Sequence, residues 1–299
     1  MTLCGAPRLG WMLLAIFCTV TACGDRETPQ PRTLKLMTFN IRWEIAGRDG
    51  PNDWPSRRAL VCDLLRDPAL DVAGLQEATP AQVADLQAAV PEMSVHDADP
   101  VMNGIAILYR ADRFELAAQG AFWFSPTPDV PESTDWSGTN RRHVCAWVRL
   151  VDLETRRAFY VYDLHLDLLA SSREKSAVLL CDRVAARSPR DPAILLGDFN
   201  AAEDARPSRY LRGEIELETS AGRRRAPERW VDSFRVVHPD ATNVGTAGGF
   251  RGRTSGAKID HIFVPPGTRV LEAAIEHHSV DGRYASDHFP VTATVVLSD

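Results

Sequence analysis

The stretch "LLGDFNAAED" (residues 195–204) runs an apolar, strand-like segment directly into Asp198 and Asn200. A carboxylate and an amide two residues apart are costly in a protein core, because burial removes the water that solvates them. At the tip of a buried strand, the same pair can position a metal ion or a water molecule against a phosphate group. The stretch therefore predicts a strand that ends in a functional site.

Other polar residues stop apolar runs in the same way elsewhere in the chain. They are Asn40 in "MTFNIRW", Glu77 in "LQEAT", His165 in "DLHLD", Asp260 in "KIDHIF", and Asp287 and His288 in "SDHFP". Taken singly, each is more readily explained as a cap or turn residue. As a set they supply the carboxylates, amides and imidazoles that hydrolysis of a phosphate ester requires, and we interpret them as one site.

Each residue type in this set has a chemical use. Mg²⁺ or Mn²⁺ prefers oxygen ligands, which predicts Glu77 and Asp287 as metal ligands. His288 suits the base that activates water near neutral pH, with Asp260 on its other ring nitrogen. Asp198 is expected to position the water or metal. The remaining side chains can donate hydrogen bonds to phosphate oxygens, namely those of Asn40, Asn200 and His165.

Hydrophobic periodicity indicates strands that alternate with amphipathic helices. Helical spacing occurs at residues 56–67, 79–90 and 172–187, and Thr79 begins the second of these with a capping-box pattern. Strand-like runs clearly outnumber helices. They include 33–41, 71–76, "GIAILYR", "ELAAQGAFWF", "HVCAWVRLV", "AFYVYDLHL", "AILLG", "VDSFRVV", "KIDHIFV" and "FPVTATVVL". This mixture of strands and helices predicts α/β layers with mixed sheets. Residues 125–140 and 218–229 are expected to be long loops.

The first 22 residues are typical of an export signal. The apolar run "LGWMLLAIFCTVTA" is too short for a membrane-spanning helix. It ends in "VTAC", which resembles a bacterial lipobox and implies cleavage before Cys23 with a lipid on its sulfur. Ordinary secretion with cleavage after Ala22 is the alternative.

These features predict three parts of the chain: a signal peptide at 1–22, a lipid-anchored tether at 23–33 and one catalytic domain at 34–299. We expect an exported, membrane-anchored lipoprotein that faces the periplasm or the cell exterior and acts as a monomer.

The formal net charge of −6 excludes the overall basic character of a nucleic-acid coat protein, but not an enzyme that meets a phosphodiester through a metal ion. Beyond Cys23, the mature chain has three cysteines, and no spacing resembles a zinc site. Cys62, Cys145 and Cys181 are expected to be buried thiols, although one disulfide could form in an oxidising compartment.

The series "TFNIRW", "LQE", "HLD", "GDFN", "IDHIFV" and "SDHFPV", in this order, resembles the endonuclease/exonuclease/phosphatase superfamily across residues 34–299. That superfamily includes deoxyribonuclease I, repair exonucleases, bacterial sphingomyelinases, inositol polyphosphate 5-phosphatases and deadenylases. The resemblance implies a four-layer α/β/β/α sandwich, in which two mixed β-sheets are flanked by helices and the site lies at one sheet edge.

The resemblance also implies roles for individual residues. Glu77 matches the metal glutamate and Asn40 the asparagine beside it, so Asn40 is also expected at the metal. His165 matches a phosphate-stabilising histidine. The remaining matches are the nucleophile-positioning pair Asp198 and Asn200, the histidine partner Asp260, and the terminal pair Asp287 and His288.

Two further stretches, "GAFWFSPTPDVP" with "RRHVCAW" and "GTAGGFRG", resemble a bacterial branch of the superfamily. This branch implies Arg142 as a phosphate contact, with a solvated loop arginine as the equal alternative. Asp163 and Leu164 stand where the family often has Asn-Thr, so Asp163 could add charge to the site or pair with His165.

Together these observations predict a divalent-metal-dependent phosphoesterase that cleaves a phosphodiester or phosphomonoester by direct attack of water. The substrate could be a nucleic acid, a phospholipid headgroup or a nucleotide-like small phosphate ester. Basic loops at 222–229 and 250–253 would suit nucleic acid but are more often solvated. Trp123 and Trp147 are expected in the core, whereas a sphingomyelinase-like toxin would need an exposed aromatic such as Trp136. The alternative from another class is a catalytically silent surface-binding lipoprotein that retains the fold.

Overall fold

The structure is a computed structural model that describes residues 1–2, 32–45, 47–97, 104–138 and 140–298. Pro31–Asp299 forms one compact unit. The signal segment and Cys23, the expected lipidation site, lie outside the described residues. Among the residues that are described, no helix is long and apolar enough to cross a membrane.

The first sheet has six strands and mixed polarity. Its strands lie in the order β13 (Arg269–Ile275), β14 (Val291–Val296), β1 (Leu34–Asn40), β2 (Val72–Gln76), β4 (Ala106–Arg110) and β3 (Met93–Asp97). β1 runs parallel to β2, whereas the other neighbours are antiparallel.

The second sheet is also mixed and six-stranded. Its order is β11 (Val231–Asp232), β12 (Asp260–Val264), β8 (Ala193–Asp198), β7 (Ala158–His165), β6 (Val144–Asp152) and β5 (Phe114–Trp123). Here β7 and β8 are the parallel pair.

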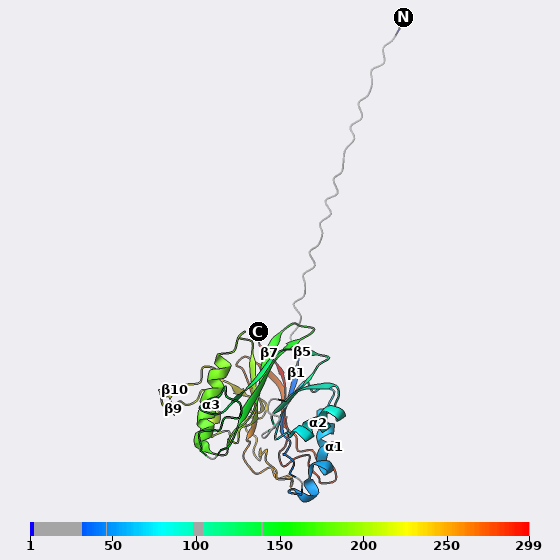
Figure 1. The fold of residues 1–299 in the computed structure, drawn as a ribbon. Coiled ribbons are helices and arrows are strands. Elements are labelled where there is room, and N and C mark those ends of the chain that lie inside the picture. The colour runs from blue at the N-terminus through cyan, green and yellow to red at the C-terminus, as the bar shows by residue number, and fades with distance from the viewer. Residues whose placement is uncertain (3–31, 46, 98–103, 139, 299) are drawn as a thin grey trace. The chain divides into compact units, whose positions relative to one another are not determined.

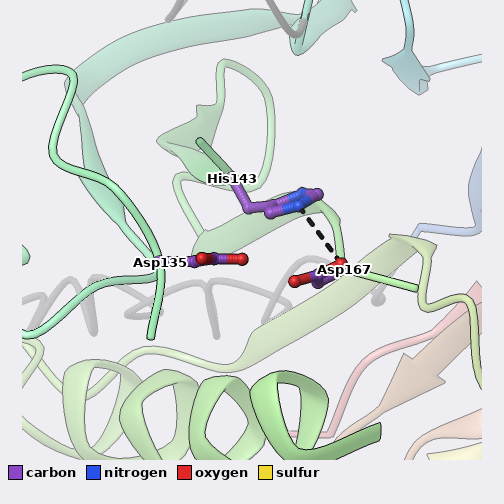
Figure 2. Close-up of side chains that lie close together, drawn as sticks. All are labelled: Asp135, His143 and Asp167. Carbon is purple, nitrogen blue, oxygen red and sulfur yellow. Dashed lines mark ion pairs between the residues drawn. The ribbon is translucent and has the colours of Figure 1, made fainter. Parts of the chain in front are cut away.

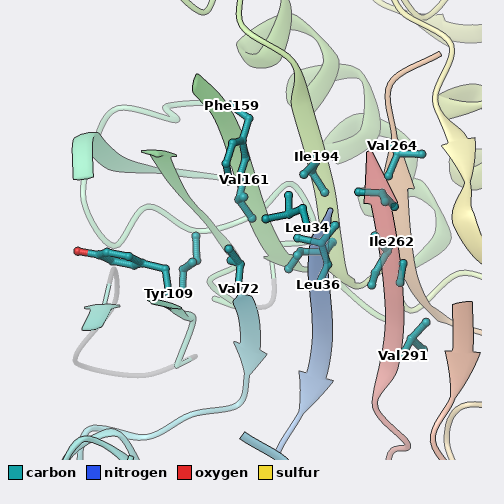
Figure 3. Close-up of a cluster of buried hydrophobic side chains, with 14 of the residues drawn as sticks. Leu34, Leu36, Val72, Tyr109, Phe159, Val161, Ile194, Ile262, Val264 and Val291 are labelled. Atoms are coloured by element: carbon teal, nitrogen blue, oxygen red, sulfur yellow. The ribbon is translucent and has the colours of Figure 1, made fainter. Parts of the chain in front are cut away.

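The two sheets pack face to face over the largest apolar cluster (Figure 3). Side chains that alternate along each strand reach this layer, as expected from the period of two in β-structure. Leu34 and Leu36 of β1 meet Ile194 and Leu196 of β8, and all four are buried. Leu195 points to the opposite face and belongs to a different cluster.

Helices cover both outer faces, and Figure 1 shows them on opposite sides of the paired sheets. A cluster beneath α1 (Trp54–Leu65) and α2 (Pro80–Ala89) joins them to the first sheet. A second cluster joins α3 (Ala170–Ala185) and α4 (Arg206–Leu211) to the second sheet. The predicted four-layer α/β/β/α sandwich is thereby confirmed.

Two local predictions are confirmed. The capping box that begins α2 is present, with Thr79 and Gln82 exchanging hydrogen bonds. Cys62, Cys145 and Cys181 are buried free thiols, as predicted.

Two predictions were wrong. "VDSFRVV" is not one strand, because Asp232 ends the two-residue β11 and caps the short helix α5 (Ser233–Val237) by accepting the Phe234 N–H at 3.1 Å. The expected loop at 218–229 contains the hairpin β9 (Leu217–Thr219) and β10 (Gly222–Arg224).

The short 3₁₀ helix η1 (Gly50–Asn52) precedes α1. The sequence pattern also missed the edge strands β3 and β13. Four of the five residues of β3 are half-buried, and the first four positions of β13 are half-buried or exposed, so neither strand shows the alternation that marks a strand.

Candidate active site

Strand direction brings the predicted residues to one edge of the sandwich. Asn40 ends β1, Glu77 follows β2, and His165 and Asp198 end the parallel strands β7 and β8. The antiparallel strands β12 and β14 start at the same edge, and their residues Asp260, Asp287 and His288 lie at or just before these starts. Asp260 is the direct neighbour of Asp198 in the sheet. The residues therefore converge on one site, as predicted.

A buried amide, that of Asn40, joins the two sheets at this edge. Its Oδ1 accepts the Arg42 N–H at 3.0 Å, and a backbone N–H can only donate, so the orientation of the amide is determined. Nδ2 then donates to Glu77 Oε1 and to Asp198 Oδ2, both at 3.1 Å. In this geometry, Asn40 orients two carboxylates, and its assignment as a metal or phosphate ligand stays a prediction.

His288 and Asp260 form a pair whose tautomer is defined. Nδ1 of His288 lies 3.0 Å from Asp260 Oδ2 and 3.3 Å from Oδ1, and ionised carboxylate oxygens only accept. Nδ1 therefore carries a hydrogen, and Nε2 is the nitrogen left for a ligand. Asp198 Oδ2 lies 3.9 Å from the same Nδ1, so Asp198, Asp260 and His288 form one compact group.

The environment separates the pKa values of these groups. Burial opposes a charge on His288, but the charge of Asp260 and the hydrogen bond to it raise the pKa of His288 to about 10. Burial would raise the pKa of Asp260, yet the adjacent His288 lowers it. Burial and the charge of Asp260 raise the pKa of Asp198. Despite burial, His165 and the Trp43 N–H lower the pKa of Glu77, so Glu77 is ionised.

The "GDFN" stretch shapes the backbone as well as the chemistry. Gly197 has φ of 148°, and a Cβ there would lie 2.1 Å from the Leu164 carbonyl oxygen, so only glycine fits. Asn200 has φ of 47° and its N–H donates to Asp198 Oδ1 at 2.8 Å. Its Nδ2 donates to the Leu166 carbonyl at 2.7 Å, which ties the tip of β8 to the segment after His165.

His165 faces the same carboxylates, with Nε2 at 3.4 Å from Asp198 Oδ2. Asp163 does not reach it. Asp163 is buried between the sheets, where its Oδ1 accepts from Gln76 Nε2 at 2.6 Å. Burial raises the pKa of Asp163 well above its usual range, so this residue is a neutral acid beneath the site.

A pocket of about 610 Å³ opens over these residues. Glu77, Asp287, Asn200 and Arg142 line it, and the role of Arg142 as a phosphate contact stays a prediction. Arg142 also pairs with Glu132 at 3.3 Å.

The sequence argument missed four cationic or aromatic lining residues: Arg42, Trp43, Arg48 and Arg141. Arg42 binds Asp49 in a bidentate contact, and its Nη1 lies 3.7 Å from Asp287 Oδ2. The only sequence signal for it was its position two residues after Asn40.

His143 also lines the pocket and was missed as a site residue. Its Nδ1 lies 3.1 Å from the carbonyl oxygen of His165. Burial and the nearby charge of His165 lower the pKa of His143 to about 4, so its ring is neutral at pH 7. A histidine directly before a strand, in "RRHVCAW", was the available signal.

Trp136, the candidate for a membrane-inserting aromatic, is only partly exposed and packs against the cluster under α3. Trp123 and Trp147 pack against the core clusters, as predicted. Residues Arg223, Arg224 and Arg225 each form an ion pair with an acidic neighbour.

The donor set fits a divalent cation. Glu77 is ionised and each of its oxygens accepts one hydrogen bond, which leaves a lone pair on each for a metal. Asp287 supplies a second carboxylate in the same pocket, and oxygen donors of this kind suit Mg²⁺ or Mn²⁺.

Comparisons with known proteins agree with this geometry. Residues 37–288 match the model of the endonuclease/exonuclease/phosphatase family. The chain belongs to this family.

Two similar structures come from Bacteroides thetaiotaomicron. One is an endonuclease/exonuclease/phosphatase family protein, 26% identical, with a TM-score of 0.77 over 90% of this chain and 100% of that chain. The other is a mannosyl-6-phosphatase, 27% identical, with a TM-score of 0.76 over 88% of this chain and 100% of that chain. An uncharacterized protein of Acanthamoeba polyphaga mimivirus is 23% identical, covering 80% of this chain and 90% of that protein.

Membership of the endonuclease/exonuclease/phosphatase family makes this chain a hydrolase that acts on phosphate esters. The family is typically dependent on divalent metals, and this chain has acidic and histidine side chains able to bind one.

Proposed function

We propose that this protein is a Mg²⁺- or Mn²⁺-dependent phosphoesterase that hydrolyses a small phosphorylated molecule by direct attack of water. The observation that carries the proposal is the joint position of Glu77, Asp287, Asp198 and the His288–Asp260 pair around one pocket.

The pKa shifts favour a different division of labour from the one predicted from sequence. A raised pKa keeps His288 protonated at neutral pH, which suits an N–H donor to a phosphate oxygen rather than a base. Asp198 has a raised pKa and is held by the Asn200 N–H, which suits the group that orients water and accepts its proton. Asp260 holds His288 in the required tautomer.

Other residues of the chain bind and orient the substrate. His165 and Asn200 are placed to contact phosphate oxygens, as is Arg142 at the pocket wall. A divalent ion held by Glu77 and Asp287 would polarise the phosphoryl oxygen and neutralise negative charge that develops there.

The pocket supports a small substrate. Its volume of about 610 Å³ lies in the range typical of small-molecule sites. Arg42, Arg48, Arg141 and Arg142 add positive charge around it, which suits a phosphate group on a chain that is acidic overall. A related protein described as a mannosyl-6-phosphatase supports sugar phosphates as the first class to test.

The test is a substrate panel assayed with Mg²⁺, with Mn²⁺ and with chelator. The panel contains hexose phosphates, a chromogenic aryl phosphate and bis-aryl phosphate, DNA, and sphingomyelin vesicles. We expect metal-dependent hydrolysis, with the highest kcat/KM on a hexose phosphate. A higher kcat/KM on DNA or vesicles would refute the substrate class. No metal-dependent hydrolysis of any member would favour the surface-binding lipoprotein.

We further propose that the protein is exported, anchored to a membrane through a lipid on Cys23, and monomeric. The support is the sequence pattern around Cys23 alone. Fatty-acid labelling of the expressed protein and of Cys23→Ala tests this, with loss of label and release from the membrane fraction expected for the variant. An equally labelled, membrane-bound variant would refute the anchor.

A further inference from the structure

A second group of ionisable side chains lies behind one wall of the pocket, and we call it the Asp135 cluster. It consists of Asp135 from the long loop before β6, His143 directly before β6, and Asp167 two residues after β7. Figure 2 shows the two carboxylates pointing toward each other with the imidazole beside them. One nitrogen or oxygen atom from each residue lies within 4.8 Å of the others.

The tautomer of His143 leaves a lone pair inside this cluster. The His165 carbonyl can only accept, so Nδ1 of His143 carries the hydrogen of the 3.1 Å contact. In the neutral ring, Nε2 is then unprotonated. It is buried, has no hydrogen-bond partner among the described residues and lies 3.8 Å from Asp167 Oδ1, another acceptor. Two facing acceptors repel each other unless a cation lies between them.

Each of the two carboxylates also has one oxygen with few or weak hydrogen bonds. The side chain of Asp167 is 1% exposed, and its Oδ2 has no hydrogen-bond partner in the part of the chain that the structure describes. Asp135 Oδ1 accepts from the Ser137 N–H at 2.8 Å, whereas Oδ2 makes a longer contact, 3.5 Å, with Ser172 Oγ.

Nearby arginines supply little positive charge to these carboxylates. Arg141 Nη1 lies 3.5 Å from Asp167 Oδ1 and is about half exposed, and Arg173 Nη1 donates to the backbone carbonyls of Asp167 and Leu168. The Leu169 N–H also donates to Asp167 Oδ1 at 3.2 Å, and the two carboxyl groups interact with each other. Among the described residues, the arginine charge next to these two buried carboxylates is thus one long contact, although burial of unpaired charge is strongly unfavourable.

We propose that the Asp135 cluster is a second divalent-cation site, next to the catalytic pocket that His143 also lines, with Asp135, His143 and Asp167 as its protein ligands. A metal-binding histidine usually donates its other ring N–H to a carboxylate or backbone carbonyl, and His143 does so. One imidazole with two carboxylates suits Mn²⁺, Co²⁺ or Zn²⁺ better than Mg²⁺, which prefers oxygen ligands only.

An ion in this cluster would position the catalytic edge. His143 contacts the main chain of His165, and Asn200 contacts the carbonyl of Leu166, one residue before Asp167. The ion would hold residues 165–167 between β7 and the tip of β8. The three ligands are therefore positioning residues for His165.

The first experiment measures Mn²⁺ bound to the purified full chain by equilibrium dialysis and elemental analysis, with four proteins compared. We expect Asp135→Asn to bind one ion fewer than the wild type, with affinity for that ion reduced at least about 100-fold. Glu77→Gln should keep this ion and lose one at the catalytic pocket. Asp129→Asn, an exposed carboxylate in the same loop, should match the wild type. Equal Mn²⁺ content in Asp135→Asn and the wild type would overturn the proposal.

A second measurement requires no variant and so does not depend on whether Asp135→Asn folds. Crystals of the wild type soaked in Mn²⁺ are measured at the manganese edge. An anomalous peak about 2.0–2.4 Å from His143 Nε2 and from oxygens of Asp135 and Asp167 is expected. A peak at Glu77 with none at the cluster would show that the two carboxylates share a proton instead.

Discussion

Replacement of Asp260 by asparagine tests the proposed division of labour most directly. Asp260 offers His288 Nδ1 two oxygens at 3.0 and 3.3 Å. An asparagine side chain at this position would offer one acceptor and place an NH₂ group where the second oxygen was. A charge-assisted hydrogen bond contributes about 1.5–3 kcal/mol, which corresponds to roughly 10- to 150-fold in rate. If the ring also adopts the wrong tautomer, the loss rises toward about 10⁴-fold.

We therefore expect D260N to lower kcat/KM by about 10- to 10⁴-fold on a chromogenic phosphate ester with saturating Mn²⁺. The pH profile gives a second signature. Asp260 raises the pKa of His288, so D260N should lower that pKa and move the alkaline limb of the profile to lower pH. D240N, at an exposed carboxylate, is the matched control and should match the wild type. Retention of kcat/KM within about threefold, with an unshifted alkaline limb, would refute the role of the pair.

Two predictions concern the buried charges that support the site. Asp163→Asn should raise the melting temperature at pH 8 but not at pH 4. Burial raises the pKa of Asp163 in the folded state, so above the pKa of the unfolded chain folding must take up a proton, and this costs stability that asparagine would not lose. Calorimetry that finds the same pH dependence of the melting temperature in the variant and the wild type would contradict this. Lys258→Met should lower the free energy of unfolding by about 3–5 kcal/mol, because Lys258 is fully buried and its Nζ lies 2.7 Å from Asp232. Urea titration measures this free energy of unfolding, and the double variant Lys258→Met/Asp232→Asn should recover part of it. A loss below about 1 kcal/mol in Lys258→Met would show that the ion pair is not needed for stability.

The parts of the fold that could be predicted from sequence are those where one local signal dominates. β8 begins with a continuous apolar run and β1 is rich in large apolar residues, and the Thr79–Gln82 capping box marks its helix by residue type alone. The segment at 231–237 failed because its apolar residues suit a strand and a helix equally. The outcome was decided by one side chain, Asp232, which caps α5 and also pairs with Lys258.

The site was predictable where residues end strands, because the direction of each strand then determines which edge it reaches. Glu77, His165 and Asp198 follow this rule. Arg42 and His143 were not predictable, since their positions depend on contacts with Asp287 and with the carbonyl of His165. Those partners are distant in sequence, so periodicity contains no signal for them.

Backbone strain is present at the same edge. Arg42, Glu77 and Asn200 all have positive φ, at 61°, 60° and 47°, although none is glycine. Such conformations cost about 1–3 kcal/mol each and persist only where surrounding contacts determine them. Here each has such a contact: Arg42 donates its N–H to Asn40, Glu77 accepts from Asn40 and Trp43, and Asn200 binds the Leu166 carbonyl. Because Asn40 contributes to two of the three, its amide couples the strained backbone on the first sheet to Asp198 on the second, and the fold thereby holds its carboxylates close together.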